Sequence, residues 1–263
     1  MKAFIKKYEI WIFLVLAPIV NVLFVYVRAE GHMNSFSYNH GRFGVLLLLL
    51  VLIVKFTRGN EGIKDMFRPM LKWKVHPKWY LLSLIFAFTI ASLTLILKNI
   101  YHGVEFSSLL NFDVTIKSLN MTFIVLIWAF MGEVVWVSYC IRQLSKITNP
   151  FYASQIVGVV WTLWWMPIVL HGEAVIPDFP FWFLLVGMMG TAGMCAVVYG
   201  HTKSGIAVWL LQFMLNMSLL MLAVSPRRGG IPTYATFVIL YYLVMLGFMY
   251  FMLKPKNKVS MVK

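Results

Sequence analysis

The sequence predicts an all-α fold, a polytopic membrane helical bundle of about eight transmembrane helices. Of the 263 residues, 61% are hydrophobic and only 12% are charged, and the mean hydropathy is +0.81. A soluble core of this size cannot bury that much apolar surface. Apolar runs recur along the chain, and their lengths are close to the roughly 20 residues that a helix needs to cross the hydrocarbon of a bilayer. Lysines and arginines are concentrated in every second loop between these runs, as they are in membrane proteins.

Eight apolar runs are predicted to span the membrane. The first is longer than the roughly 7–15 apolar residues of a signal peptide and lacks a small-x-small cleavage site, so we interpret it as a retained helix. The second is short, but it is apolar on every side, as a lipid-facing helix should be. We expect residues 1–253 to form a single transmembrane domain, followed by a basic tail at 254–263. The predicted spans are 10–28, 43–57, 79–97, 119–141, 151–170, 180–199, 204–224 and 232–253.

The segment between the second and third spans predicts an amphipathic helix in the membrane interface, at about 61–74. Its apolar residues recur at helical spacing and its basic residues lie off that stripe, a pattern typical of interfacial helices. Pro69 should kink or interrupt this helix. Trp73, Trp79 and Tyr80 are expected at headgroup depth. The apolar stripe consists of Ile63, Met66, Phe67, Met70 and Leu71, and the basic residues are Lys64, Arg68, Lys72 and Lys74.

The loop charges predict an orientation. With eight spans, seventeen lysines and arginines fall on the side of the termini and six on the other side. This bias predicts cytoplasmic N- and C-termini, and we expect a multi-pass protein of the cell membrane, namely a bacterial plasma membrane. The net charge of +14 favours anionic membrane lipids as partners, and nucleic acid is not expected because the basic residues form no stripe with interleaved aromatics. Cys140 and Cys195 match no metal or disulfide spacing and are expected to pack.

One acidic residue, Glu133, lies inside an apolar run, in "IWAFMGEVVWVSYCIRQL". A carboxylate at mid-span costs about 2.5–3.5 kcal/mol on insertion scales, so it is normally paired, protonated or functional. None of its α-helical neighbours at i±3 and i±4 can neutralise it. We therefore expect a protonated Glu133 that is hydrogen-bonded to another helix, with Asn216 and Gln212 as the leading partners. The other polar candidates are Asn21, Gln155, Thr162 and Thr191.

Three short stretches resemble the motifs of a known family in order and spacing. They are "GEVVWVSY" at 132–139, "WTLWWMP" at 161–167 and "QFMLN" at 212–216. Together with the entry segment "DMFRPMLKWKVHPKWYLLSLIFAF", they make residues 61–220 similar to the CPBP family, the CAAX-protease and bacteriocin-processing (Abi) intramembrane peptidases. The resemblance implies about eight membrane helices around an intramembrane site with glutamate, histidine and asparagine residues.

The motifs are degenerate in this chain. By the resemblance, the leading glutamate is Gly132, the arginine is Val137, the activating histidine is Trp165 and the later histidine is Gln212. Only Glu133, at the supporting glutamate, and Asn216 match, so we predict these two as catalytic remnants. Gln212, Trp165 and Trp136 are predicted to line the degenerate site and to form a binding surface.

These losses predict a pseudo-peptidase. Hydrolysis needs a base that can activate water and an acid for the leaving nitrogen, and neither indole nor amide side chains exchange protons near neutral pH. We expect a membrane-embedded binding protein, for bacteriocin or peptide immunity or as a scaffold or regulator of another membrane enzyme. Its partner would be another membrane protein or a hydrophobic, membrane-active peptide. The alternative is a divergent intramembrane endopeptidase that uses Glu133 as base with Asn216.

No metal or cofactor is expected. His171 and Glu173 lack the helical spacing of a zinc motif, Asp178 lies nearby in the same outer loop, and His201 falls on the opposite side of the membrane. A transporter is poorly motivated, because the spans contain no acidic relay besides Glu133.

Overall fold

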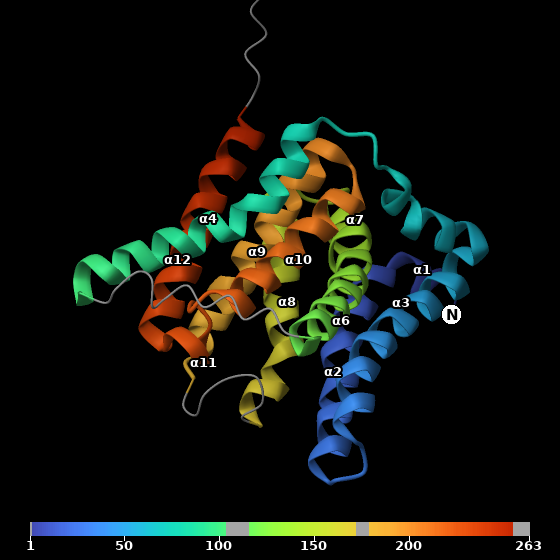
Figure 1. The fold of residues 1–263 in the computed structure, drawn as a ribbon. Coiled ribbons are helices and arrows are strands. Elements are labelled where there is room, and N and C mark those ends of the chain that lie inside the picture. Colours follow the sequence, from blue (N-terminus) through green and yellow to red (C-terminus); the bar gives the residue numbers. More distant parts are fainter. Residues whose placement is uncertain (1, 104–115, 172–178, 255–263) are drawn as a thin grey trace, which may run out of the picture.

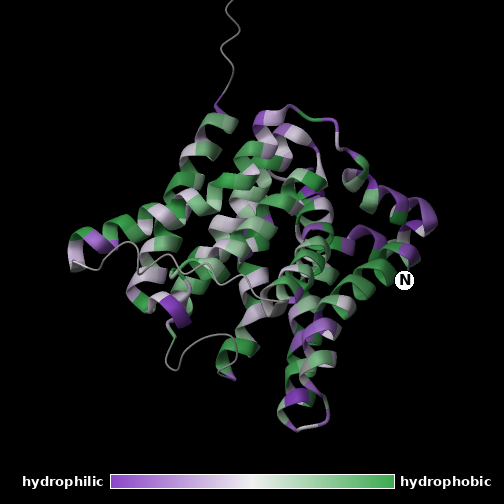
Figure 2. Ribbon diagram, in the orientation of Figure 1, coloured by the Kyte–Doolittle hydropathy of each residue, from purple (hydrophilic) through white to green (hydrophobic). Residues whose placement is uncertain are grey.

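The computed structural model describes residues 2–103, 116–171 and 179–254. These residues form a helical bundle without strands in the described part of the chain (Figure 1). Eight of the described helices are long and apolar enough to cross a membrane, and each overlaps one predicted span. Hydrophilic residues gather at the ends of the long helices in Figure 2. The chain is thus a polytopic, all-α membrane protein, as predicted.

Most of the predicted boundaries are correct within a few residues, but the second span is much longer than expected. The elements are α1 (Lys2–Lys7), α2 (Glu9–Ala29), α3 (Ser35–Phe67), η1 (Arg68–Leu71), α4 (Pro77–His102), α6 (Ile116–Gly132), η2 (Glu133–Ile141), α7 (Arg142–Leu144), α8 (Pro150–Leu170), α9 (Phe181–Thr202), α10 (Gly205–Met221), α11 (Pro226–Gly229) and α12 (Ile231–Leu253).

Local sequence signals explain several helix starts. Asn34, Asn149 and Ser204 precede α3, α8 and α10, and their side chains accept hydrogen bonds from backbone N–H groups of the first turn. Such caps satisfy donors that have no partner inside the helix. Proline occupies the first turn of α4 and α8, where its missing N–H costs nothing.

The long helix α3 changes direction at Gly59. The backbone there has φ 65° and ψ −156°, a region that is essentially reserved for glycine. After this kink a short helical stretch continues to Phe67, and the 3₁₀ turn η1 follows with Pro69 near its start. The predicted interfacial helix at 61–74 therefore ends early, at the proline that was expected to interrupt it.

The predicted faces of this segment are mostly correct. Four of the five apolar residues, Ile63, Met66, Phe67 and Met70, pack against the core. Leu71 does not, because the 3₁₀ turn changes the helical period and leaves it 78% exposed. The basic residues Lys64, Arg68, Lys72 and Lys74 are exposed, as predicted.

The spanning helices close a ring around one buried segment. Contacts between neighbouring helices run from α3 to α2, α8, α9, α12, α4, α10 and α6, and then back to α3. The segment η2, which continues α6, is buried at all nine of its residues. It contacts α3, α8, α9 and α10. Glu133 is the first residue of this enclosed segment.

Candidate functional site

Glu133 lies at the start of a π-helical stretch. Its side chain is 0% exposed, and Ser138 Oγ donates a hydrogen bond of 2.6 Å to Glu133 Oε1. A π-helix has i→i+5 hydrogen bonds and more residues per turn than an α-helix, so residues five apart share one face. The expectation that a partner must come from another helix was therefore wrong, since it assumed the α-helical period.

Two glycines allow helix α10 to approach the Glu133 carboxylate closely. A Cβ at Gly205 would lie 3.1 Å from each carboxylate oxygen of Glu133 and would overlap the sulfur of Met70. A Cβ at Gly132 would lie 3.2 Å from Gln212 Oε1. A side chain at position 132 would therefore require the Gln212 side chain to shift. Met70, which belongs to η1, and the Glu133 carboxylate thus approach Gly205 from the same side, where a Cβ would point.

Three of the five predicted site residues line this region. Gln212 is 3% exposed and faces Gly132. Trp136 is 0% exposed and stacks on Trp161 with ring centroids 5.6 Å apart. Glu133 and Trp136 belong to the buried segment η2, and Gln212 belongs to α10, which packs against η2.

The other two predicted residues lie elsewhere. Asn216 is exposed, and its side-chain amide donates to the backbone oxygen of Gln212 at 2.8 Å. Trp165 packs beside Trp164 and Arg42, with the guanidinium carbon of Arg42 5.2 Å from its ring centroid. The expected hydrogen bond between Glu133 and Asn216 or Gln212 is not formed. Glu133 accepts a hydrogen bond from Ser138 instead, and the Asn216 amide donates to the backbone of its own helix.

Three buried polar atoms around Glu133 have no hydrogen-bond partner within the described ranges. They are Glu133 Oε2, which carries the proton in the expected neutral form, and two N–H donors, Trp136 Nε1 and Gln212 Nε2. Buried polar groups are nearly always partnered. The region therefore retains unused hydrogen-bonding capacity, although it has no ion pair to Glu133 among the described residues.

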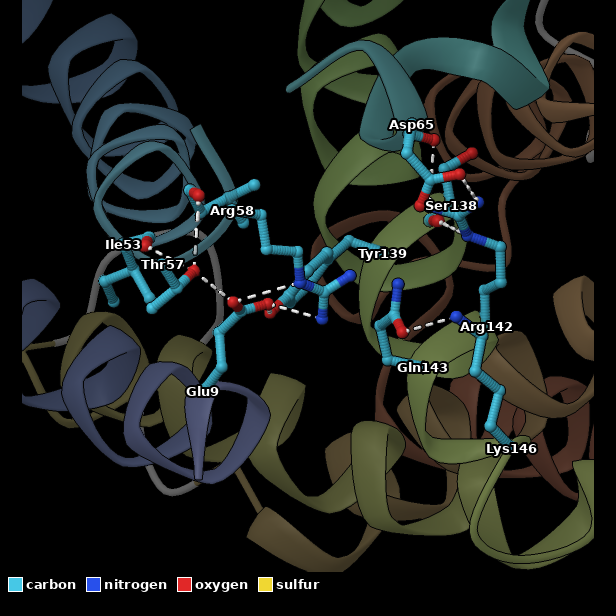
Figure 3. A network of polar contacts seen from close by, with 11 residues as sticks. Glu9, Ile53, Thr57, Arg58, Asp65, Ser138, Tyr139, Arg142, Gln143 and Lys146 are labelled. Carbon is cyan, nitrogen blue, oxygen red and sulfur yellow. Dashed lines mark hydrogen bonds and ion pairs between the residues drawn. The ribbon is translucent and has the colours of Figure 1, made fainter. Parts of the chain in front are cut away.

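Burial of a second carboxylate, that of Glu9, was not predicted from the sequence. Glu9 is 2% exposed. It accepts a hydrogen bond of 2.6 Å from the hydroxyl of Tyr139 and pairs with Arg58 at 2.6 Å (Figure 3). The hydroxyl of Thr57 also donates to it. Glu9 directly precedes the first apolar run, so only its position at that boundary could have indicated burial.

Arg142 ties the buried segment to the stretch after the Gly59 kink. Its guanidinium pairs with both carboxylate oxygens of Asp65, at 3.1 and 2.9 Å (Figure 3). Its Nε donates to the backbone oxygen of Ser138 at 2.6 Å. Ser138 thus contacts Glu133 through its hydroxyl and Arg142 through its carbonyl. Asp65 falls in the predicted interfacial helix and Arg142 directly after the fourth predicted span, and no pattern in the sequence indicated that they pair.

The candidate metal-ligating residues and the two cysteines lie partly within the described residues. Within the described residues no cluster of three histidine, cysteine, aspartate or glutamate side chains could hold a metal ion. Glu173 and Asp178 lie outside the described residues. Cys140 and Cys195 are free, buried thiols inside spans, as predicted.

Comparisons with known proteins add no identity to this geometry. No family model matches the chain, and no curated protein matches it. The resemblance to the CPBP family therefore stays a prediction from the three motifs, while the chain itself is a multi-pass helical membrane protein.

Proposed function

We propose that this chain is a membrane-embedded binding protein with a CPBP-like layout and no peptidase activity. The observation that carries the proposal is the closure of the interior around Glu133. The carboxylate is fully buried, accepts a hydrogen bond from Ser138 and lies against Gly205 of α10, where a Cβ would be 3.1 Å from both of its oxygens. A hydrolytic site needs a water beside a base and a donor for the oxyanion. Asn216, the second matching residue, is exposed and bonded to its own helix.

Binding would use the outside of the ring. The spanning helices expose many large apolar side chains, among them Trp11, Phe123 and Phe251. Such surfaces suit lipid, a hydrophobic peptide or another membrane protein. Because the interior is filled, the partner would be recognised at these faces or at the loops. We therefore favour immunity against a membrane-active peptide, or a scaffold for another membrane enzyme.

The test has two arms. Purified protein is incubated with prenylated and hydrophobic peptides, and native membranes are crosslinked before the protein is isolated. We expect no cleavage and a stoichiometric membrane partner or intact peptide in the isolate. Cleavage that is lost in Glu133→Gln would overturn the proposal.

The alternative is a divergent intramembrane endopeptidase. It is favoured by the buried polar atoms of Glu133, Trp136 and Gln212 that have no hydrogen-bond partner among the described residues, because water or a substrate carbonyl could satisfy such groups. It requires the surrounding side chains, among them Met70 near Gly205, to move, because Glu133 is 0% exposed. Cleavage that increases when Met70 is changed to alanine and disappears in Glu133→Gln would select this alternative.

We further propose that both termini are cytoplasmic. The support is the distribution of basic residues, seventeen against six over the predicted loops. This bias is typical of the cytoplasmic side in bacterial plasma membranes.

A further inference from the structure

Residues 60–74 form a segment that folds back against one end of the bundle, and we call it the lid segment. It comprises the part of α3 after the Gly59 kink, the 3₁₀ turn η1 and the first residues of the connection to α4, and it is the teal ribbon between α3 and α4 in Figure 1. A Cβ at Gly62 would lie 2.8 Å from a methyl group of Val54. The lid segment therefore lies directly against the part of α3 that precedes the kink.

The backbone at each end of the lid segment is suited to act as a hinge. Gly59 has φ 65°, and a Cβ built on it would meet no heavy atom of the described residues within 4 Å, so neighbouring side chains leave room for the backbone to rotate there. At the other end, residues 72–76 belong to no helix. Hinges of protein lids are typically a few residues at the ends of elements that absorb large changes of φ and ψ. The lid segment can thus move as a unit while the spanning parts of α3 and α4 keep their positions.

One ion pair ties the centre of the lid segment to the rest of the bundle. The Arg142 guanidinium donates to the Asp65 carboxylate at 3.1 and 2.9 Å and to the Asp65 backbone oxygen at 2.9 Å (Figure 3). Bidentate, charge-assisted contacts of this kind are stronger than neutral hydrogen bonds. The two side chains are 15% and 32% exposed, so the pair lies at the edge of the bundle and not in its core. Nearer to α4, Ser204 Oγ donates to the backbone oxygen of Lys72 at 2.5 Å.

The inner face of the lid segment reaches the surroundings of Glu133. A Cβ at Gly205 would overlap the Met70 sulfur and would lie 3.1 Å from both carboxylate oxygens of Glu133, so Met70 and Glu133 approach α10 at the same point. The outer face is basic, since the side chains of Lys64 and Arg68 are 73% and 79% exposed. An apolar inner face and a basic outer face suit a segment that lies between the interior of the bundle and the aqueous edge of the membrane.

We propose that residues 60–74 are a hinged lid that controls access to the interior around Glu133, and that the Asp65–Arg142 ion pair is its latch. When the pair separates, the lid segment turns about Gly59 and withdraws Met70 from α10. This movement opens a path from that end of the bundle to Glu133 for water or for part of a bound partner. The lid is independent of the choice between a binding and a peptidase function, because it concerns access to the interior and not the chemistry inside it.

The experiment measures how fast a small, water-soluble methanethiosulfonate labels the two native cysteines of the full chain in lipid nanodiscs, which expose both membrane faces. Cys195 lies near Glu133 and reports on the interior, whereas Cys140 in η2 reports on general unfolding. Asp65→Ala removes the latch, and it is preferred to a change of Arg142 because Arg142 also donates to the backbone of η2. We expect Cys195 to be labelled about tenfold faster or more in Asp65→Ala than in the wild type, since loss of charge-assisted hydrogen bonds shifts an opening equilibrium by about this factor. Cys140 should stay protected.

Glu61→Ala is the matched control, because it removes an acidic residue of the same segment whose ion pair with Lys64 lies at the surface, with side chains 81% and 73% exposed. This variant should label Cys195 at the wild-type rate. Asp65→Asn and Glu61→Gln keep the side-chain shapes and form a second pair, which decides if Asp65→Ala fails to fold. Equal rates of Cys195 labelling within a pair would overturn the proposal. Joint labelling of Cys195 and Cys140 in the Asp65 variant would also overturn it, because Asp65 would then stabilise the whole bundle and not a lid.

Discussion

At the scale of single residues, Glu133 depends on one partner that its sequence position conceals. Ser138 follows it by five residues. Side chains five residues apart point in different directions in an α-helix, but they lie on one face of a π-helix. The sequence identified Glu133 as a costly buried carboxylate because no other acidic residue lies inside an apolar run. It did not identify Ser138, since nothing in "EVVWVSYCI" marks a π-helical period.

Ser138→Ala should therefore destabilise the protein. It removes the one hydrogen bond that Glu133 receives from the described residues, and leaving a buried polar group unsatisfied costs about 1–3 kcal/mol. Ser83→Ala is the matched control, because Ser83 is also 0% exposed but its hydroxyl has no partner in the described ranges. Unfolding in graded denaturing detergent measures both, and equal stabilities would contradict this role of Ser138.

Glu133→Gln should be tolerated. The amide oxygen can accept the Ser138 hydrogen bond with nearly the same shape, so we expect a change in the free energy of unfolding below about 1 kcal/mol. Thermal unfolding of the purified variant checks this expectation. A large loss of stability in this isosteric variant would show that the negative charge itself is required.

At the scale of elements, Gly59 is the residue that shapes the long second span. Gly59→Ala should destabilise the protein by about 1–3 kcal/mol, because a Cβ is not accommodated at this φ and ψ. Gly44→Ala in the same helix has open space for its Cβ and should be stabilising by up to about 1 kcal/mol. Thermal shifts of the same sign in the two variants would contradict the kink as a required feature.

Helix positions were predicted well and their exact ends less well. Long apolar runs fix where a helix crosses, so all eight spans were found. The extension of α3 on both sides of 43–57 was missed, because polar stretches such as "SFSYNHGR" continue a helix only when they pack against another element. Arg42 shows this directly, since its place in the bundle depends on the rings of Tyr38, Trp164 and Trp165.

At the scale of the whole molecule, the arrangement of the spanning helices in a ring explains why the predicted site residues do not all lie together. The motif order predicted one site, and Glu133, Trp136 and Gln212 do lie in one region. Asn216 and Trp165 do not, because the faces that they occupy depend on helix rotation within the ring, which sequence spacing does not fix. Burial of Glu9 and pairing of Asp65 with Arg142 likewise require helices far apart in sequence to be adjacent.

An even number of spans places both termini on one side of the membrane. Reporter domains fused to the C-terminus and, separately, inserted between α2 and α3 should report opposite sides, with the C-terminus cytoplasmic. The same side for both fusions would contradict the eight-span arrangement.

The central claim is that water does not reach the interior around Glu133, and the native cysteines can test it. Cys195 is 0% exposed and lies near Glu133 and Gln212, and Cys140 is equally buried in η2. Intact membranes are treated with a small, water-soluble methanethiosulfonate, and each thiol is assigned by peptide mass. The account predicts no labelling of either cysteine before denaturation and full labelling after it. Rapid labelling of Cys195 in the folded protein, with Cys140 still protected, would reveal an aqueous path to the site and contradict the claim.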